Sequence, residues 1–273
     1  MSKLDVAGVQ RPLTDLAKAN LERLEVFSSI ASTNTYLMTQ PPPSAGRYRV
    51  AIADHQTSGR GRHNRHWISA PGSGVYLSIA YTFRSLAEQL DGLTLAIGVG
   101  VIAALQRLDI GGLTLKWPND IVALDGKLGG ILTEIQSGKA ADVTVVTGVG
   151  LNLNFEQNFD FGTESGWAQR AVDLKSIKPD LPDRELIAGT LVDDLFLTFK
   201  RFEGSGLAGF MDDWREHDWL HGREITVDMP DQQVTGIAAG IGDDGTLLVE
   251  TKGGQVRVLS GSIVMAGPGE AAN

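Results

Sequence analysis

The sequence predicts an α+β fold, with helices packed on one mixed β-sheet and a small SH3-like β-barrel at the C-terminal end. Short runs rich in β-branched and aromatic residues recur through the first half of the chain, separated by turn residues. Two segments with helical periodicity, about 86–108 and 183–202, accompany them. After Gly222 the chain changes to short strands separated by Gly and Asp-Gly, which is typical of a barrel. We therefore expect a large domain at 1–220 and a small one at 221–273.

Strands are expected where apolar residues alternate or cluster between Gly, Pro, Asn or Asp. The dipeptide Asp125-Gly126 predicts a tight hairpin turn, which would make Lys127 the first residue of the next strand. The first 25 residues predict a single amphipathic helix that begins at Pro12 and carries leucines at 13, 16, 21 and 24. The expected strands comprise residues 49–54, 74–83, 113–117, 121–124, 127–135 and 142–155, then 223–229, 233–241, 243–251 and 255–261.

The composition indicates a globular protein that works in a reducing compartment. The chain of 273 residues contains no cysteine, which excludes disulfides and thiolate metal sites. No signal peptide and no apolar stretch of bilayer length are recognisable, so we expect a cytoplasmic protein with no membrane partner. The formal net charge of −9 favours a small anionic ligand over a long polyanion such as DNA. We therefore expect no nucleic-acid partner.

The stretch from His55 to Trp67 concentrates positive charge within this acidic chain. It reads HQTSGRGRHNRHW and contains three arginines but no acidic residue. A guanidinium group offers a planar fork of donors that suits bidentate phosphate binding. The glycines next to Arg60 and Arg62 would let the loop stay open until an anion orders it. The alternative is a solvated basic surface loop without a ligand.

A second group of polar residues lies where two expected strands meet. Residues 116–120, KWPND, end one strand and begin another, and taken alone they are equally consistent with a structural turn. Lys127 is followed by Gly129 and Gly130 inside an expected strand. Glycines weaken a strand interior unless a ligand or another backbone must come close. We therefore interpret Lys127 as a candidate for binding the charged group of a ligand.

Residues 148–154, GVGLNLN, are not a dinucleotide-binding fingerprint, because no third glycine follows at the required spacing and no helix is expected after them. A strand whose glycines admit a flat ligand such as adenine is one interpretation, and a strand turn capped by asparagine is the other. Ordinary helix N-capping explains most runs like Ala31–Thr35. His217 and His221 lie four residues apart without a further clustered ligand, so no metal site is expected.

Together these segments resemble the biotin protein ligase family over residues 28–155, and the expected C-terminal barrel is similar too. The features that carry the resemblance are Ser32-Thr33-Asn34, Gln56, GRGR at 59–62 with Arg65 and Trp67, KWPND at 116–120, KLGGIL at 127–132 and GVGLNLN at 148–154. One departure is His63, which stands where some relatives carry a third arginine. Only one helix is expected before Glu25, so we expect a monofunctional ligase without a DNA-binding domain or repressor activity.

The resemblance implies a two-step ligase whose substrates are biotin and ATP, with Mg²⁺ on the phosphates. The carboxylate of biotin would attack the α-phosphate of ATP, which gives biotinyl-5′-adenylate and pyrophosphate. A lysine of the biotin carboxyl carrier protein or domain of acetyl-CoA or related carboxylases would then take the biotinyl group and release AMP. We expect a monomer or a weak homodimer.

The resemblance also implies roles for individual residues. The implied catalytic residues are Lys127, Arg60 and Arg62. The implied biotin-binding residues are Ser32, Thr33, Asn34, Gln56, Arg60, Gly61, Arg62, Lys127, Gly129 and Gly130. The implied nucleotide-binding residues are Arg62, Trp67, Lys116, Asn119, Asp120, Asn152 and Asn154. No metal ion held by the protein itself is implied.

Elementary chemistry agrees with this interpretation. A carboxylate and a triphosphate repel each other, so fixed cations such as Lys127 and the loop arginines must lie between them. No general base is needed, because the attacking carboxylate is already ionised at neutral pH. Three alternatives stay open: a lipoate–protein ligase of the same broad fold, a nucleic-acid-binding module that uses the arginines and the barrel, and a scaffold built around the barrel.

Overall fold

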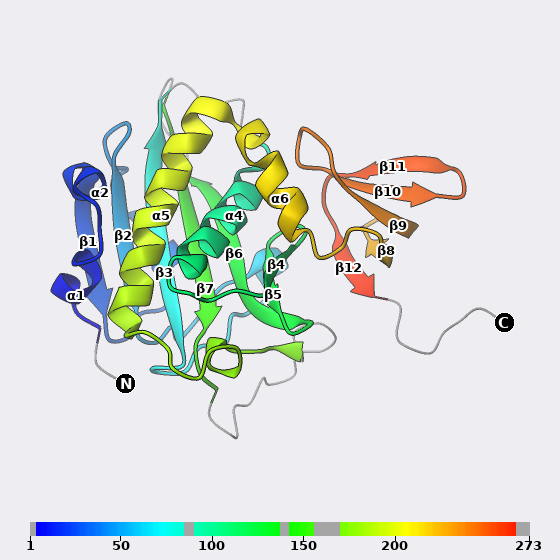
Figure 1. Cartoon of the computed structure of the whole chain (residues 1–273). Coiled ribbons are helices and arrows are strands. Elements are labelled where there is room, and N and C mark those ends of the chain that lie inside the picture. The colour runs from blue at the N-terminus through cyan, green and yellow to red at the C-terminus, as the bar shows by residue number, and fades with distance from the viewer. Residues whose placement is uncertain (1–3, 85–89, 137–141, 156–169, 266–273) are drawn as a thin grey trace.

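The computed structural model describes residues 4–84, 90–136, 142–155 and 170–265. Seven strands form one mixed sheet, which confirms the architecture predicted for the larger part of the chain (Figure 1). β1 and β2 are parallel, whereas all other neighbouring strands in this sheet are antiparallel. In spatial order the strands are β1 (Leu21–Phe27), β2 (Tyr48–Ala53), β3 (Gly74–Phe83), β7 (Val143–Asn152), β6 (Gly126–Gln136), β5 (Asp120–Ala123) and β4 (Leu113–Lys116).

Two long helices, α4 (Leu93–Gln106) and α5 (Arg184–Ser205), cover one face of this sheet (Figure 1). Alternate strand residues point to them and are fully buried, as Val50 and Ile52 of β2 show. The periodic segment expected at about 183–202 is confirmed as α5. The other expected helix, at about 86–108, is present as Leu93–Gln106, residues 90–92 precede it outside the helix, and residues 86–89 of that prediction lie outside the described residues.

The opposite face carries one short helix, α3 (Thr33–Thr39), which packs Leu37 against small side chains of β2, β3 and β7. Ser32 is its N-cap, because the Ser32 side chain accepts a hydrogen bond from the backbone N–H of Thr35. The N-capping interpretation of this run is therefore confirmed. Since α3 is only seven residues long, it leaves much of this sheet face to other segments.

The hairpin between β5 and β6 turns one residue earlier than predicted. Ala123 pairs with Gly126, so the two central turn residues are Leu124 and Asp125, with left-handed φ angles of 48° and 53°. Gly126 belongs to the strand, and a Cβ there would collide with the carbonyl oxygen of Arg170. Close packing rather than the turn therefore requires this glycine, and the residue after it becomes the second of β6.

The N-terminal segment is not the single helix that the leucine spacing predicts. It forms two short helices, α1 (Val6–Gln10) and α2 (Asp15–Asn20), and the chain then enters β1, where Leu24 is buried. The fully buried Asp193 accepts hydrogen bonds of 2.8 Å from both the backbone N–H and the hydroxyl of Thr14, which fixes the start of α2. Tertiary contacts and parallel pairing with β2 therefore outweigh the helical pattern.

The C-terminal part forms a separate five-stranded antiparallel sheet, so the predicted strands are present, but the sheet does not close into a complete barrel. Within the described part of the chain, no ladder joins the edge strands β11 and β12. The alternation of apolar residues predicts strands without showing whether they close. The division at residue 220 stays a prediction. In spatial order the strands are β11 (Gly254–Val258), β10 (Leu247–Thr251), β9 (Gln233–Ile241), β8 (Glu224–Asp228) and β12 (Ser262–Met265).

Short helices complete the described chain. They are α6 (Met211–His217) and the 3₁₀ turns η1 (Arg62–Asn64), η3 (Leu174–Ser176) and η4 (Leu207–Phe210). No helix among the described residues combines the length and the apolar character needed to cross a membrane.

Candidate active site

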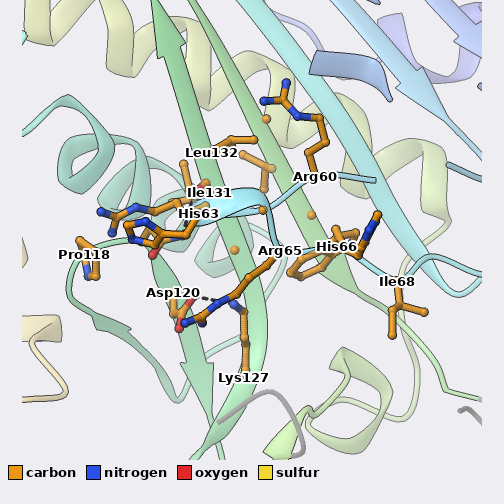
Figure 2. Close-up of a pocket in the computed structure, with 18 of the residues that line it drawn as sticks. Arg60, His63, Arg65, His66, Ile68, Pro118, Asp120, Lys127, Ile131 and Leu132 are labelled. Carbon is orange, nitrogen blue, oxygen red and sulfur yellow. Dashed lines mark hydrogen bonds and ion pairs between the residues drawn. The ribbon is translucent and has the colours of Figure 1, made fainter. Parts of the chain in front are cut away.

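A cavity of about 940 Å³ lies on the α3 face of the large sheet (Figure 2). Residues of β3, β6 and β7 line it from the sheet, together with the first turn of α3 and residues 116–120. Further lining comes from the segment at 59–67, which we call the arginine loop. Asp228 and residues 261–264 of the C-terminal sheet border another side. The cavity therefore collects segments that lie far apart in the sequence.

The arginine loop is a compact hairpin-like turn. The backbone N–H of Trp67 donates to the carbonyl oxygen of Gly59 at 2.9 Å, and Gly61 donates to Arg65 at 2.8 Å. Neither glycine has a positive φ, whereas His63 has a φ of 55°. Gly59 is required for space, because a Cβ there would collide with the carbonyl oxygen of Trp67. The expected conformational freedom of the glycines is therefore not what shapes this loop.

One end of the cavity is built from hydroxyl and amide groups that are tied to one another. Gln56 Oε1 accepts hydrogen bonds from the backbone N–H of Thr33 at 2.8 Å and from the hydroxyl of that residue at 3.1 Å. The hydroxyl of the fully buried Ser78 lies 2.6 Å from Asn34 Oδ1 and 2.7 Å from Thr33 Oγ1. Ser78 was not predicted, although one serine within the apolar run GVYLSIAYTF signals a buried polar partner.

The middle of the cavity is occupied by the indole of Trp67. A Cβ on Gly150 would lie 2.5 Å from its ring, and one on Gly130 would lie 3.2 Å from it. The glycines of β6 and β7 therefore admit a flat group, but that group is a side chain of the protein itself. The buried Trp67 Nε1 has no hydrogen-bond partner within the described part of the chain. Trp67 as a whole is only partly buried and lines the cavity.

The other end of the cavity is cationic. Lys127 Nζ lies 2.7 Å from an oxygen of Asp120 and 5.6 Å from the centre of the Trp67 ring (Figure 2). Lys116 is buried, and this burial lowers its pKa to about 8. The carboxylate of Asp120 acts in the opposite direction, whereas Lys127 and Arg65 reinforce the lowering. A pocket lined by several Lys and Arg side chains and, among the described residues, by the two carboxylates of Asp120 and Asp228 is suited to an anionic ligand.

The three loop arginines point to different partners. Arg60 binds Glu134 of β6 with two hydrogen bonds, at 2.9 and 3.1 Å. Arg62 Nη2 lies 3.3 Å from Ser260 Oγ, and Arg65 Nη2 lies 3.2 Å from Ser262 Oγ. The loop therefore connects the large sheet with the C-terminal sheet. The sequence gives no local signal for these partners, since single Ser and Glu residues are ordinary on strand surfaces.

Comparison with known proteins decides the family. Residues 26–152 match the Biotin/lipoate A/B protein ligase family, and residues 220–265 match the biotin protein ligase C terminal domain. The biotin–[acetyl-CoA-carboxylase] ligase of Mycobacterium tuberculosis is 33% identical over 257 residues, which cover 91% of each chain. The chain belongs to the biotin protein ligase family. The bifunctional ligase/repressor BirA of Escherichia coli is 32% identical over 232 residues, which are 84% of this chain and 69% of that protein.

Solved structures of biotin protein ligases share the fold. The enzyme from Aquifex aeolicus in complex with biotin and ATP superimposes with a TM-score of 0.75 at 27% identity and covers 90% of this chain and 100% of that one. An Aquifex aeolicus variant in complex with biotin gives a TM-score of 0.74 at 26% identity, covering 90% and 99%. The architecture of a biotin protein ligase is thus present along most of the chain.

Most residues that the resemblance to biotin protein ligases singles out meet in the cavity. The residues that line it are Ser32, Thr33, Asn34, Gln56, Arg60, Gly61, Arg62, Trp67, Lys116, Asn119, Asp120, Lys127, Gly130 and Asn152. Gly129 and Asn154 do not line it. Gly129 approaches the backbone of β7, since a Cβ there would lie 2.7 Å from the carbonyl oxygen of Gly150. The roles of all these residues in binding or catalysis stay predictions.

Proposed function

We propose that this biotin protein ligase activates biotin with ATP to biotinyl-5′-AMP and transfers the biotinyl group to a lysine of a biotin carboxyl carrier protein or domain. The observation that carries the proposal is one cavity with two chemically different ends. An uncharged end of hydroxyl and amide groups suits the ureido ring of biotin, which needs both donors and acceptors. A cationic end suits a carboxylate and a triphosphate that must meet.

In the first step the carboxylate of biotin forms a bond to the α-phosphorus of ATP, and the bond to the β-phosphate oxygen breaks to release pyrophosphate. Lys127 would lie between the two anions, and Lys116 and Arg62 would add charge around the phosphates. Their positions at one end of the cavity support this assignment. Fixed cations in a site shielded from water stabilise the crowded phosphorus centre far more than mobile ions in solution do.

In the second step the amine of the carrier lysine attacks the acyl carbon of the adenylate, and AMP leaves. The mixed anhydride reacts readily with water, so it must be held and shielded until the carrier arrives. The arginine loop and residues 261–264 border the cavity on the sides that the sheet does not cover. We propose that they shield the intermediate, and that Trp67 packs against its adenylate part.

Mg²⁺ would enter with ATP as the ion on its phosphates. No group of three or more His, Asp or Glu side chains in the described residues could hold a metal ion by itself. Asp120 is a carboxylate at the cationic end and fits the pattern of one protein carboxylate with substrate phosphates that Mg²⁺ adopts. When bound there, the ion would neutralise phosphate charge.

The partner and the setting are further proposals. We propose a carrier domain of acetyl-CoA carboxylase or a related carboxylase as acceptor, action in the cytoplasm, and a monomeric or weakly dimeric enzyme without a nucleic-acid partner. The relatives named biotin–[acetyl-CoA-carboxylase] ligase support the acceptor. The absence of cysteine and the net charge of −9 in the full sequence support a reducing compartment and a ligand other than DNA.

ATP–pyrophosphate exchange in the presence of biotin tests the first step, with lipoate as the comparison substrate. We expect exchange with biotin and at most a trace with lipoate, because lipoate has no ureido group for the hydroxyl and amide end. Mass spectrometry of a carrier domain then tests the transfer, and a carrier whose target lysine is replaced by arginine is the control. Exchange with lipoate alone would make the protein a lipoate ligase, and exchange with neither would end the proposal.

A further inference from the structure

We infer that Glu134 is a positioning residue that holds the arginine loop over the uncharged end of the cavity by binding Arg60. The inference rests on the proposed function and adds a residue to it that neither the sequence motifs nor the family comparison singles out. It starts from one observation: of the three loop arginines, Arg60 is the one that an acidic side chain holds by hydrogen bonds in the described chain.

The pair has a favourable geometry. Arg60 Nη1 donates to Glu134 Oε2 at 3.1 Å, and Nη2 donates to Oε1 at 2.9 Å, so the two planar groups meet through parallel hydrogen bonds. The Glu134 side chain is 23% exposed and that of Arg60 is 41% exposed. Figure 2 shows Arg60 directed away from Lys127 and Asp120, toward the opposite end of the cavity. The carboxylate of Glu134 therefore balances the charge of Arg60, and Arg60 does not belong to the cationic end.

Glu134 is itself fixed to the uncharged end. Its Oε2 accepts a second hydrogen bond, at 3.1 Å, from the amide nitrogen of Asn34, which is buried. The same amide donates to the carbonyl oxygen of Leu132 at 3.2 Å, and its oxygen lies 2.6 Å from the hydroxyl of Ser78. A carboxylate whose partners are held this firmly loses little side-chain entropy when it binds a loop arginine.

Both sides of the arginine loop are thereby attached to one polar network. On the side that precedes the loop, Gln56 binds Thr33, whose hydroxyl lies next to Ser78. Within the loop, Arg60 reaches the same network through Glu134 and Asn34. Side chains that contact biotin at this end would therefore also influence the position of the arginine loop. Glu134 is suited to keep the loop closed while the adenylate waits for its carrier.

Replacement of Glu134 by glutamine isolates the proposed contact. Glu134→Gln keeps an oxygen that can accept from Asn34 but removes the charge that holds Arg60. We expect the pre-formed biotinyl-5′-AMP to dissociate about 2- to 5-fold faster, the range that the loss of a partly exposed ion pair allows. Trypsin should also cleave within residues 60–65 faster in the biotin complex. A residue that only supports the fold would change neither quantity specifically.

A double-mutant cycle separates the pair from its surroundings. Arg60→Gln should accelerate release to the same extent, and the double variant Arg60→Gln/Glu134→Gln should show no further increase. The matched control is Glu22→Gln, which removes a similarly half-buried pair with Arg49 between β1 and β2, and neither of these residues lines the cavity. It should leave both adenylate release and loop cleavage at the wild-type values.

Release from Glu134→Gln at the wild-type rate, or effects that multiply in the double variant, would overturn the inference. If Glu134→Gln does not fold, Arg60→Gln on the exposed loop still tests the pair, because wild-type release from it gives the same negative answer. Failure of the proposed function is a different result, since the wild-type protein would then form no adenylate whose release could be measured.

Discussion

Lys127 Nζ lies 2.7 Å from a carboxylate oxygen of Asp120 at the cationic end of the cavity. The two side chains come from adjacent strands, β6 and β5, and both are less than one quarter exposed. Because Lys127 is paired with Asp120, its ammonium group is fixed in position before any anionic ligand binds. We expect the carboxylate of biotin to compete with Asp120 for the same donor when it binds.

Lys127→Ala should therefore slow the formation of biotinyl-5′-AMP strongly. Loss of one preorganised charge donor should cost about 3–4 kcal/mol of transition-state stabilisation. The measurement is single-turnover adenylate formation at saturating biotin and ATP. Lys200→Ala is the control, because Lys200 pairs with Glu203 on the surface of α5. Adenylate formation near the wild-type rate in Lys127→Ala would remove Lys127 from the mechanism.

The pKa of Lys116 predicts a specific pH dependence. Burial lowers this pKa to about 8, so the side chain is charged at pH 7 and loses its charge as the pH rises through about 8. Attraction for the phosphates is thus present below that pH and lost above it. We expect KM for ATP to rise between pH 7 and pH 9, while KM for biotin changes less.

Lys116→Met provides the comparison for this pH profile. Because methionine carries no titrating group, the variant should have a raised KM for ATP already at pH 7 and a flat profile up to pH 9. Phosphates near Lys116 favour its charged form, so ATP binding to the wild-type protein above pH 8 should take up protons, which calorimetry in two buffers measures. Equal profiles for both proteins would show that Lys116 does not bind ATP.

The sequence pattern predicts where the strands lie, but it does not show whether the C-terminal strands close into a barrel. β3 lies where it was expected, at Gly74–Phe83, because a fully buried strand is a continuous apolar run bounded by Gly and polar residues. The N-terminal segment was misassigned because its leucines satisfy a helical period, whereas their partners are in β2 and α5, far away in the sequence. Closure of the C-terminal sheet likewise depends on pairing between distant strands.

The same distinction applies to the candidate site. Residues such as Lys127 and Trp67 were found because glycines or arginines beside them mark an unusual backbone or charge pattern. Ser78 and Glu134 were missed because a single polar residue on a strand has many ordinary explanations. Their roles follow only from the side chains that the fold places against them, at 2.6 Å for Asn34 and 2.9 Å for Arg60.

Gly148→Ala tests the packing of the uncharged end. A Cβ at this position would overlap Asn34 Oδ1, so the amide must move and its contact with Ser78 is disturbed. We expect a loss of about 1–3 kcal/mol in the free energy of unfolding, as is usual for overpacking. Biotin should also bind more weakly, by calorimetric titration. Gly204→Ala in α5 is the control, because no atom lies within 4 Å of its Cβ; unchanged biotin binding in Gly148→Ala would contradict the assignment.

The contact between the arginine loop and the C-terminal sheet predicts a selective effect on ATP. Arg62 and Arg65 reach the hydroxyls of Ser260 and Ser262 at 3.3 and 3.2 Å. The double variant Ser260→Ala/Ser262→Ala should raise KM for ATP about 5-fold, since two exposed hydrogen bonds of about 0.5 kcal/mol each together contribute about 1 kcal/mol. KM for biotin should change less, because Arg60 is still held at the other end of the cavity.

A matched control for this variant comes from the same sheet. The hydroxyl of Thr235 lies 2.8 Å from that of Thr226 on the neighbouring strand, and neither residue lines the cavity. Thr235→Ala removes a comparable hydrogen bond of the C-terminal sheet without touching the loop, so KM for ATP should stay at the wild-type value. If both variants raise this KM equally, the stability of the sheet is responsible. If only the serine variant does, the C-terminal sheet acts on ATP binding through the two loop arginines.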